Sequence, residues 1–339
     1  MKQLQKYLIN NLSVLFFSIF MPLFAIASVI FMIKLATYTA IIQLSIVEML
    51  KLYMFILPDL LFYTMPISFF VASALSLYKL SNDNEMIILF SLGIHPSKIL
   101  KILLKPAMLL SLLLFTISFV IIPHTTILSK NFIQNKKSEA KFNLSASEYG
   151  HKFGKWLLYV GKDNNKKSYS DVFLFKKDKD EEIIIISKKA EILNSSNILQ
   201  MKLTNGQAYT YSKEKFSQLD FKTMFINDSL SNNLIKYETP LQYWFSDIDK
   251  EKKKKWIIIY SILCLFPICI VFLSLVFGIV HTRHQKSYIY LYLFLTTIIY
   301  YGLTIGLYKN LGYLTIPLVL GSFSFISYLT YRKKVVTKF

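Results

Sequence analysis

The sequence predicts a polytopic α-helical membrane protein, with six transmembrane helices and an all-β, jelly-roll-like domain inserted at its midpoint. Three observations predict this class. Three long apolar stretches precede a polar block of about 130 residues and three follow it, each near the roughly 20 residues that a helix needs to cross hydrocarbon. Charged residues make up only 17% of the chain, below the roughly 25% of soluble domains. Strand-like segments separated by turn residues fill the polar block.

The six apolar stretches define the predicted spans and divide the chain into three regions. The spans are Leu12–Ile33, Tyr53–Tyr78, Ile99–Ile122, Trp256–Val280, Tyr288–Leu307 and Leu311–Tyr331. We expect transmembrane helices 1–3 within residues 1–123, the β domain over residues 124–250 and transmembrane helices 4–6 within residues 251–339. We do not expect the first stretch to be a cleaved signal peptide, because it is longer than an h-region and Lys34 follows it.

Lysines and arginines in the short loops predict the orientation, because such residues are retained on the cytoplasmic side. One side of the predicted membrane carries Lys2, Lys6, Lys79, Lys98, Lys101, Lys105, Arg283, Lys286, Arg332, Lys333, Lys334 and Lys338. The short loops of the other side carry Lys34, Lys51 and Lys309. Both termini are therefore expected in the cytoplasm and the β domain outside it. The run Lys252–Lys255 opposes this assignment, but long translocated domains largely escape the rule.

Short strands separated by turns predict the architecture of the inserted domain. The candidate strands are Trp156–Val160, Val172–Phe175, Glu182–Ser187, Ile198–Leu203 and Ala208–Tyr211. Turn residues occur at Gly161–Asn165, Asn194–Asn197 and Thr204–Gly206. No helical pattern of about 10–15 residues intervenes. An antiparallel sandwich, barrel or jelly roll is therefore favoured over a parallel α/β sheet.

The sequence lacks the common motifs of nucleotide-hydrolysing enzymes, metalloenzymes and serine hydrolases. It contains no GxxxxGK[ST] phosphate loop, so we expect no ATP hydrolysis by this chain alone. No HExxH or GxSxG motif occurs, and His281 and His284 fit a basic loop better than a metal site. Cys264 and Cys269 lie within a predicted span as packing residues. The net charge of +19 comes largely from lysines that flank spans, which favours anionic lipid contact over nucleic-acid binding. No cofactor or metal is expected.

The loop between the second and third spans predicts a short helix near residues 82–94, within the stretch SNDNEMIILFSLGIHPSK. Asn82 is placed to cap a helix whose third position is Glu85, and Gly93 is placed to end it. About ten residues give roughly 15 Å of helix, too short to cross a bilayer. Glu85 then has two interpretations: a carboxylate that satisfies its own helix terminus, or one presented to a cytoplasmic partner.

These residues resemble those of the lipopolysaccharide-export permeases LptF and LptG. The resemblance covers nearly the whole chain and is sharpest in LPDLLFYTMP, from Leu57, and in the E-x7-G-I-x-P-S run from Glu85 to Ser97. It implies a half-permease of an ABC-type exporter in the bacterial inner membrane, which extracts lipopolysaccharide. The implied partners are a paralogous LptF/LptG half-permease, a cytoplasmic LptB-like ATPase dimer and a periplasmic LptC-like β-jelly-roll protein.

The resemblance also implies two sets of site residues. The short helix would dock on the ATPase, which makes Glu85, Leu89, Leu92 and Gly93 its coupling residues. In the family, basic residues at the outer end of span one meet lipid A phosphates. Lys34 and Lys309 are therefore candidates for contact with the lipid. Asp59 is a further candidate for a different reason, because an ionisable residue within a span marks function by default. Each retains an ordinary alternative: the lysines as interfacial anchors, and Asp59 as a carboxylate that reaches water or pairs with Lys51.

Two other classes of protein share part of this layout. A mechanotransmitting membrane subunit like FtsX or MacB also works with a separate ATPase, but its outer domain normally follows span one rather than span three. A membrane enzyme acting on lipid-linked sugars would need clustered carboxylates or histidines at one membrane surface, and no such cluster is evident in the sequence.

Overall fold

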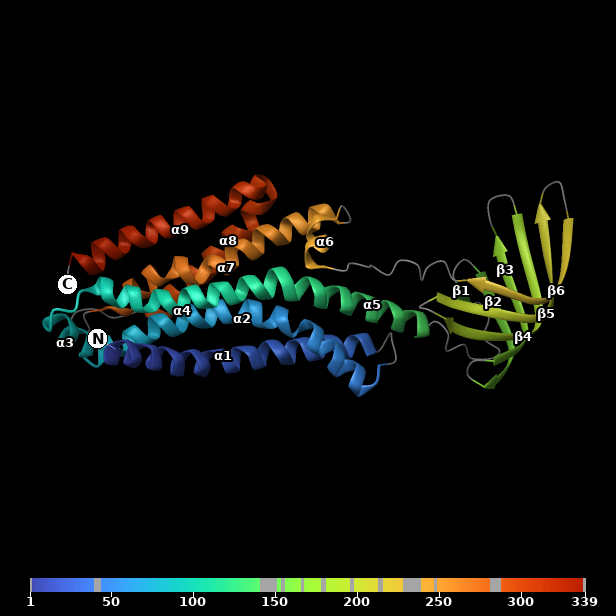
Figure 1. Ribbon diagram of the computed structural model, residues 1–339, viewed down its shortest axis with the longest axis horizontal. Coiled ribbons are helices and arrows are strands. Elements are labelled where there is room, and N and C mark those ends of the chain that lie inside the picture. The colour runs from blue at the N-terminus through green and yellow to red at the C-terminus, as the bar shows by residue number, and fades with distance from the viewer. Residues whose placement is uncertain are drawn as a thin grey trace. The chain divides into compact units, whose positions relative to one another are not determined.

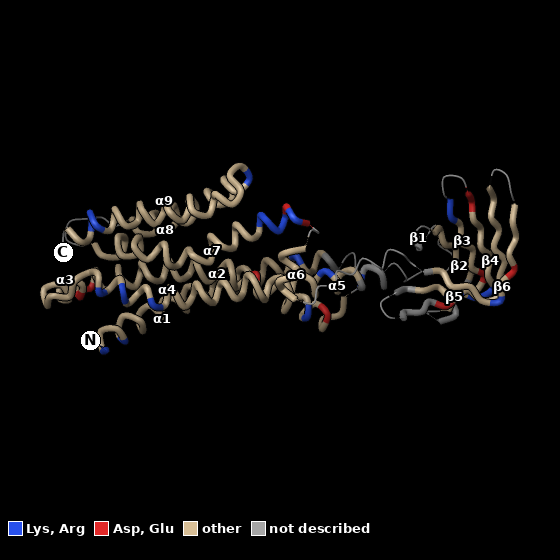
Figure 2. The backbone as a smooth tube through the Cα atoms, turned by 45° about the horizontal axis from the view of Figure 1, so that its top comes forward, with Lys and Arg blue, Asp and Glu red and all other residues tan. Residues whose placement is uncertain are grey.

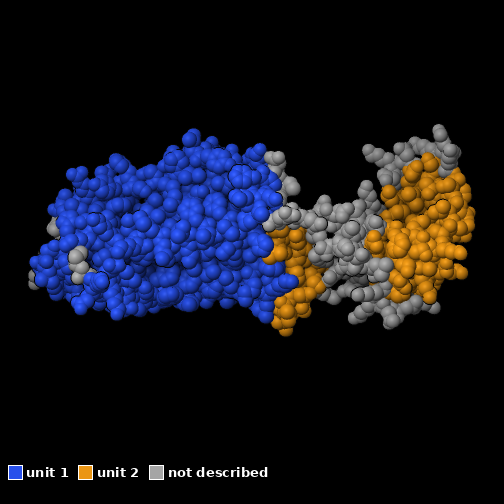
Figure 3. Space-filling model, in the orientation of Figure 1, with its two compact units in different colours: residues 1–36, 50–126, 237–339 blue, residues 37–49, 127–236 orange. Residues whose placement is uncertain are grey.

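The computed structural model describes residues 2–39, 44–140, 151–153, 156–165, 168–177, 181–195, 198–212, 216–227, 239–246, 249–280 and 288–337. The chain divides into two compact units (Figure 3). Unit 1 comprises Met1–Ala36, Leu50–Thr126 and Tyr237–Phe339, and unit 2 comprises Thr37–Met49 and Ile127–Lys236. The predicted basic-loop residues His281 and His284 lie outside the described residues.

Unit 1 is a bundle of long apolar helices (Figure 1). Its long helices are α1 (Lys2–Thr39), α2 (Ile46–Asn82), α4 (Pro96–Thr116), α7 (Lys250–Gly278), α8 (Ile289–Leu311) and α9 (Thr315–Tyr331). Its short elements are α3 (Glu85–Ser91), α6 (Pro240–Phe245), a 3-10 turn (Gly312–Leu314) and two π-helical turns (Ile117–Ile121 and Arg332–Val336). Within the described residues, five helical segments are long and apolar enough to cross a membrane.

The fifth of these segments, Ile289–Val336, contains α8 and α9 and corresponds to two of the predicted spans. The ring centroids of Tyr300 on α8 and Phe323 on α9 lie 4.9 Å apart. In one continuous helix, 23 residues would separate these side chains by about 35 Å. The chain therefore reverses between α8 and α9, where Gly312 has a positive φ of 55°, and the segment is a helical hairpin.

α7 lies at the centre of the bundle, where it packs against α4, α8 and α9. Ser73 Oγ of α2 donates a hydrogen bond of 2.7 Å to Ser274 Oγ of α7. Gly278 permits close approach of α2 and α7, because a Cβ there would lie 2.4 Å from Leu77 Cβ and 2.7 Å from the Ala74 carbonyl oxygen. In lipid, helices associate mainly through such packing of small residues and through interhelical hydrogen bonds. α2 and α7 therefore form a tightly packed pair.

α4 continues through the π-helical turn Ile117–Ile121 into α5 (Ile122–Ala140). Pro123 has no N–H to donate to the Phe119 carbonyl, four residues earlier in the chain. The indole Nε1 of Trp244 on α6 donates to that carbonyl oxygen at 3.0 Å. A side chain therefore supplies the hydrogen bond that Pro123 does not.

The range 124–250, predicted as the β domain, contains helices at both of its ends. Residues 124–140 belong to α5, and α6 lies just before α7. α5 is mostly polar, and it has no apolar stripe that would mark it as a helix in the sequence. Lys136 of α5 forms an ion pair of 2.7 Å with Glu48 of α2, so a polar contact holds this part of unit 2.

The rest of unit 2 is a six-stranded antiparallel sheet, as the sequence predicted for the domain in general terms. Its strands are β1 (His151–Phe153), β2 (Trp156–Asn165), β3 (Ser168–Lys177), β4 (Glu181–Ser195), β5 (Ile198–Ser212) and β6 (Phe216–Asn227). Each strand pairs with its neighbour in sequence. The described strands therefore form a meander, and the Greek-key connectivity of a jelly roll is not confirmed.

One row of residues interrupts the pairing of the four longest strand pairs at the same place. This row, which we call the crease, consists of Gly161, Asp171, Lys188, Asn205 and Lys222. Asp171 and Asn205 adopt left-handed φ values of 53° and 54°, which Asp and Asn tolerate better than most residues. The turns predicted at Thr204–Gly206 and Gly161–Asn165 were wrong, because β5 and β2 run through them.

The crease changes the phase of the alternation between buried and exposed residues. On β3, Tyr169 and Val172 are both buried on either side of Asp171, at a spacing of three rather than two. β4 repeats this shift between Ser187 and Ala190. If the strands alternated with a period of two throughout, the side chains buried on one side of the crease would lie on the opposite face from those buried on its other side. Both halves of the sheet therefore contribute to one apolar core.

Candidate functional site

The two ends of the helical bundle carry different elements. One end, here called the terminal end, holds the first turns of α1, the whole of α3 and the segment Arg332–Val336 (Figure 1). The other, here called the hairpin end, holds α6, the first turns of α7 and the turn Gly312–Leu314 between α8 and α9. Figure 2 shows lysine and arginine gathered at both ends, with long uncharged stretches between them.

α3 is the short helix that the sequence predicted near residues 82–94, but it begins differently. α2 runs on to Asn82, and Asn84 precedes α3 with a positive φ of 60° and no capping bond from its side chain. The predicted cap at Asn82 was therefore wrong, because that residue still belongs to the preceding helix. Gly93 ends the helical turn as predicted, with a φ of 79° that favours glycine.

Glu85 is the first residue of α3 and is half-buried. Its Oε2 accepts a hydrogen bond of 2.7 Å from the Tyr7 hydroxyl of α1. The capping-box interpretation of Glu85 was therefore wrong, since the carboxylate reaches a different helix rather than its own terminus. No sequence pattern points to Tyr7, which is one tyrosine among 22 in the chain.

α3 has one side in the bundle and one side exposed. Met86 is buried in the core, and Leu89 packs partly buried against it. Ile88 and Leu92 point outward with 56% and 72% of their surface exposed. The predicted coupling residues Glu85, Leu89 and Leu92 therefore differ in their surroundings, and Leu92 is the most accessible of the three.

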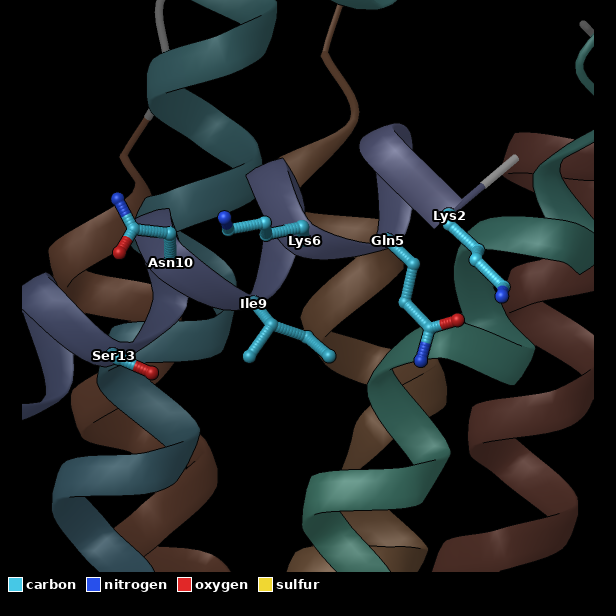
Figure 4. Close-up of a pocket in the computed structure, with 6 residues that line it drawn as sticks. All are labelled: Lys2, Gln5, Lys6, Ile9, Asn10 and Ser13. Atoms are coloured by element: carbon cyan, nitrogen blue, oxygen red, sulfur yellow. The ribbon is translucent and has the colours of Figure 1, made fainter.

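The first turns of α1 line an open cavity of about 470 Å³. Its lining residues all come from one face of α1, and they are Lys2, Gln5, Lys6, Ile9, Asn10 and Ser13 (Figure 4). An adjacent face of the same helix carries Leu8 and Leu12, which are buried in the core. The start of α1 is thus amphipathic, with two lysines on its open side.

The three lipid-binding candidates lie on separate helices, and no hydrogen bond or ion pair joins them in the part of the chain that the structure describes. Lys34 is exposed near the end of α1, and Lys309 is exposed in the last turn of α8. Asp59 is half-buried in α2. Its alternative interpretation, a carboxylate that reaches water or pairs with Lys51, stays a prediction.

A bundle of membrane-length helices with an antiparallel sheet inserted at its midpoint defines a polytopic membrane protein of the permease type. The family described as lipopolysaccharide export system permease LptF/LptG matches residues 6–329. Because this match covers nearly the whole chain, the protein belongs to the LptF/LptG family, whose members are transport subunits rather than enzymes. A comparison with curated proteins finds no match to the chain.

Proposed function

We propose that this chain is one half of an ABC-type exporter that extracts lipopolysaccharide from the outer leaflet of the bacterial inner membrane. It would pair with a paralogous half-permease and be driven by an LptB-like ATPase dimer in the cytoplasm. An LptC-like jelly-roll protein in the periplasm would receive the lipid. The observation that carries this proposal is the geometry of α3, a helix that is anchored in the bundle yet presents apolar side chains outward.

The arrangement of the helix ends supports six membrane crossings with both termini in the cytoplasm. The α8–α9 hairpin supplies the fifth and sixth crossings, since Tyr300 and Phe323 face each other across it. α3 lies at the terminal end with both chain termini (Figure 1), so an ATPase that docks on α3 would share a compartment with them. The lysine bias of the short loops independently favours the cytoplasm for this end.

α3 is suited to transmit a force from the ATPase in two ways. Met86 fixes the helix to the core, so a push on the exposed Leu92 would move packed helices rather than a loose loop. The bond from Tyr7 to Glu85 links α3 to α1, which makes few other buried contacts. A displacement of α3 would thus change the position of α1. Lys34 would move with α1 and contact the lipid.

The apolar core of unit 2 supports the last part of the proposal. Its buried side chains include Leu158, Leu174, Ile185, Met201 and Leu203, and the crease directs both halves of the sheet toward them. We infer that acyl chains pass along this apolar interior toward an LptC-like partner. Lys309 and Asp59, at the outer ends of their spans, would contact the lipid before this transfer.

Replacement of Glu85 by alanine tests the proposal at its central residue. We expect E85A to assemble with the membrane partner but to lose ATPase association or lipopolysaccharide transport in proteoliposomes. Asp83→Ala is the matched control, because it removes an exposed carboxylate two residues away. Normal transport by E85A would return Glu85 to a purely structural role, and failure of the wild-type chain to co-purify with an ATPase would remove the exporter assignment.

A further inference from the structure

Four consecutive lysines at the start of α7 fall into two pairs with different surroundings. Lys252 Nζ forms an ion pair of 3.3 Å with Asp249 Oδ1. Lys253 is only 5% exposed, and its Nζ donates to the Ser246 carbonyl oxygen at 3.1 Å and to Ser246 Oγ. The first two lysines of the run are thus satisfied by residues next to them in the chain.

Lys254 and Lys255 are instead directed at the turn between α8 and α9. Lys254 Nζ lies 5.3 Å from the Tyr313 ring centroid. Lys255 Nζ lies 5.2 Å from the Tyr308 ring centroid and 5.5 Å from that of Trp256. Ammonium groups within about 6 Å of an aromatic ring are attracted to its face. The rings therefore hold both ammonium groups at defined positions without neutralising their charge.

Lys309 follows Tyr308 in the sequence and is exposed in the last turn of α8. None of the three lysines forms an ion pair with a residue in the described ranges. Glu251, one helical turn earlier, is exposed and bonds to none of them. We call these three lysines, together with Tyr308 and Tyr313, the lysine–tyrosine patch. Two ammonium groups held by the same hairpin, with a third lysine in its last helical turn, attract an anion from outside the chain.

The depth of the patch indicates what that anion is. Its lysines immediately precede Trp256, where the apolar part of α7 begins, and aromatic residues of this kind favour the headgroup region of a bilayer. Beside the patch, α8 and α9 expose Ile305, Leu314 and Leu318, which suit acyl chains. Phosphate is well bound by lysine as a point charge, and it is the anion of lipid headgroups at this depth.

We propose that the lysine–tyrosine patch binds the phosphate group of an anionic lipid at the hairpin end of the bundle. Lys254 and Lys255 supply the charge, the tyrosine rings fix their geometry, and the α8–α9 hairpin takes the acyl chains. Two lipids offer this chemistry, lipopolysaccharide and an anionic phospholipid. The choice of lipopolysaccharide rests on the proposed function, whereas phosphate binding itself does not.

Lipid binding by the full chain in detergent, followed by native mass spectrometry, tests the proposal. The probes are bisphosphorylated lipid A, the same lipid after dephosphorylation, phosphatidylglycerol and phosphatidylcholine. The double variant K254Q/K255Q is expected to lose about ten-fold or more in affinity for a phosphate-bearing anionic lipid. The variant Y308L/Y313L keeps all charges and is expected to lose about two- to five-fold. K333Q/K334Q, which removes two exposed lysines at the terminal end, is the matched control.

The outcomes separate the patch from a general effect of charge. The patch is supported if affinity falls in K254Q/K255Q, falls less in Y308L/Y313L, and does not fall in K333Q/K334Q or for dephosphorylated lipid A. Lipid A is affected if the source is the substrate, and phosphatidylglycerol is affected if it is the bilayer. Equal loss in K333Q/K334Q, or no loss in either double variant, overturns it. ATPase co-purification of the same proteins is measured separately, so the exporter assignment can fail while phosphate binding at the patch stands.

Discussion

The hydroxyl of Tyr7 donates a hydrogen bond of 2.7 Å to the Glu85 carboxylate, which joins the first helix of the chain to the short helix between α2 and α4. The two residues are 78 positions apart in sequence. The bond is exposed to solvent, so it is a contact that a docking partner can reach and exchange for one of its own.

Replacement of Tyr7 by phenylalanine removes this bond while keeping the ring. Hydrogen bonds to charged groups contribute about 1.5–3 kcal/mol, and we expect the low end here because the bond is exposed. The predicted result is an intact complex in which ATP hydrolysis continues but lipopolysaccharide transport per ATP falls. Tyr290→Phe, on an exposed tyrosine of α8, is the control. Unchanged coupling in Y7F would show that α1 and α3 move independently.

The orientation is tested by thiol labelling, because both native cysteines are buried. We expect a cysteine at position 197, in the inserted unit, to react with a membrane-impermeant maleimide applied to the periplasm of intact cells. A cysteine in place of exposed Ser91 on α3 should react only after the inner membrane is broken. The reverse pattern would invert the topology and place α3 away from any cytoplasmic ATPase.

Gly206→Ala tests the close approach of the strands next to the crease. A Cβ at this position would lie 2.3 Å from the Ile186 carbonyl oxygen and 2.5 Å from Phe221 Cζ, so the strands must shift apart. Overpacking of this kind typically costs about 1–3 kcal/mol, and we expect faster limited proteolysis within residues 151–227 of the full chain. Gly302→Ala is the control, since no atom lies within 4 Å of its added Cβ. Equal protease resistance of the two variants would contradict the close approach at Gly206.

Lys34→Gln tests the proposed lipid contact on α1. If the ammonium group meets a phosphate in a partly desolvated cavity, its removal should weaken lipopolysaccharide capture by about ten- to hundred-fold. Lys34→Arg should restore part of the binding, because the charge returns with a different donor geometry. Photo-crosslinking from neighbouring positions of α1 measures the captured lipid. Crosslinking that does not change in K34Q would identify Lys34 as an interfacial anchor only.

Hydropathy and turn residues in the sequence were sufficient to predict the long helices and the antiparallel character of the insert. They predicted neither the crease nor the full lengths of the strands. Thr204–Gly206 has the composition of a turn, yet cross-strand pairing on both sides of β5 keeps it extended apart from Asn205. Local composition reports flexibility of the backbone, whereas the partner strands decide whether the chain turns or merely bends.

Only those features of the candidate site that lie within a single helix could be predicted from the sequence. The position of α3 and its end at Gly93 follow from local signals, because a short apolar segment between two spans has few alternatives. The partner of Glu85 does not follow from local signals, because Tyr7 reaches Glu85 only when α1 packs on the bundle. The lysine–tyrosine patch was missed for the same reason. Lys254 and Tyr313 lie 59 residues apart in sequence and meet only because α8 and α9 form a hairpin.

The close packing at Gly278 has a mechanical consequence. α2 ends three residues before α3, and at that end Ser81 Oγ donates to the Gly278 carbonyl oxygen at 2.8 Å. A side chain at position 278 would force α2 and α7 apart. With glycine there, the two helices are in direct contact at this point. If an ATPase displaces α3, as proposed, α2 and α7 would move together, and the displacement would reach the first turns of α7.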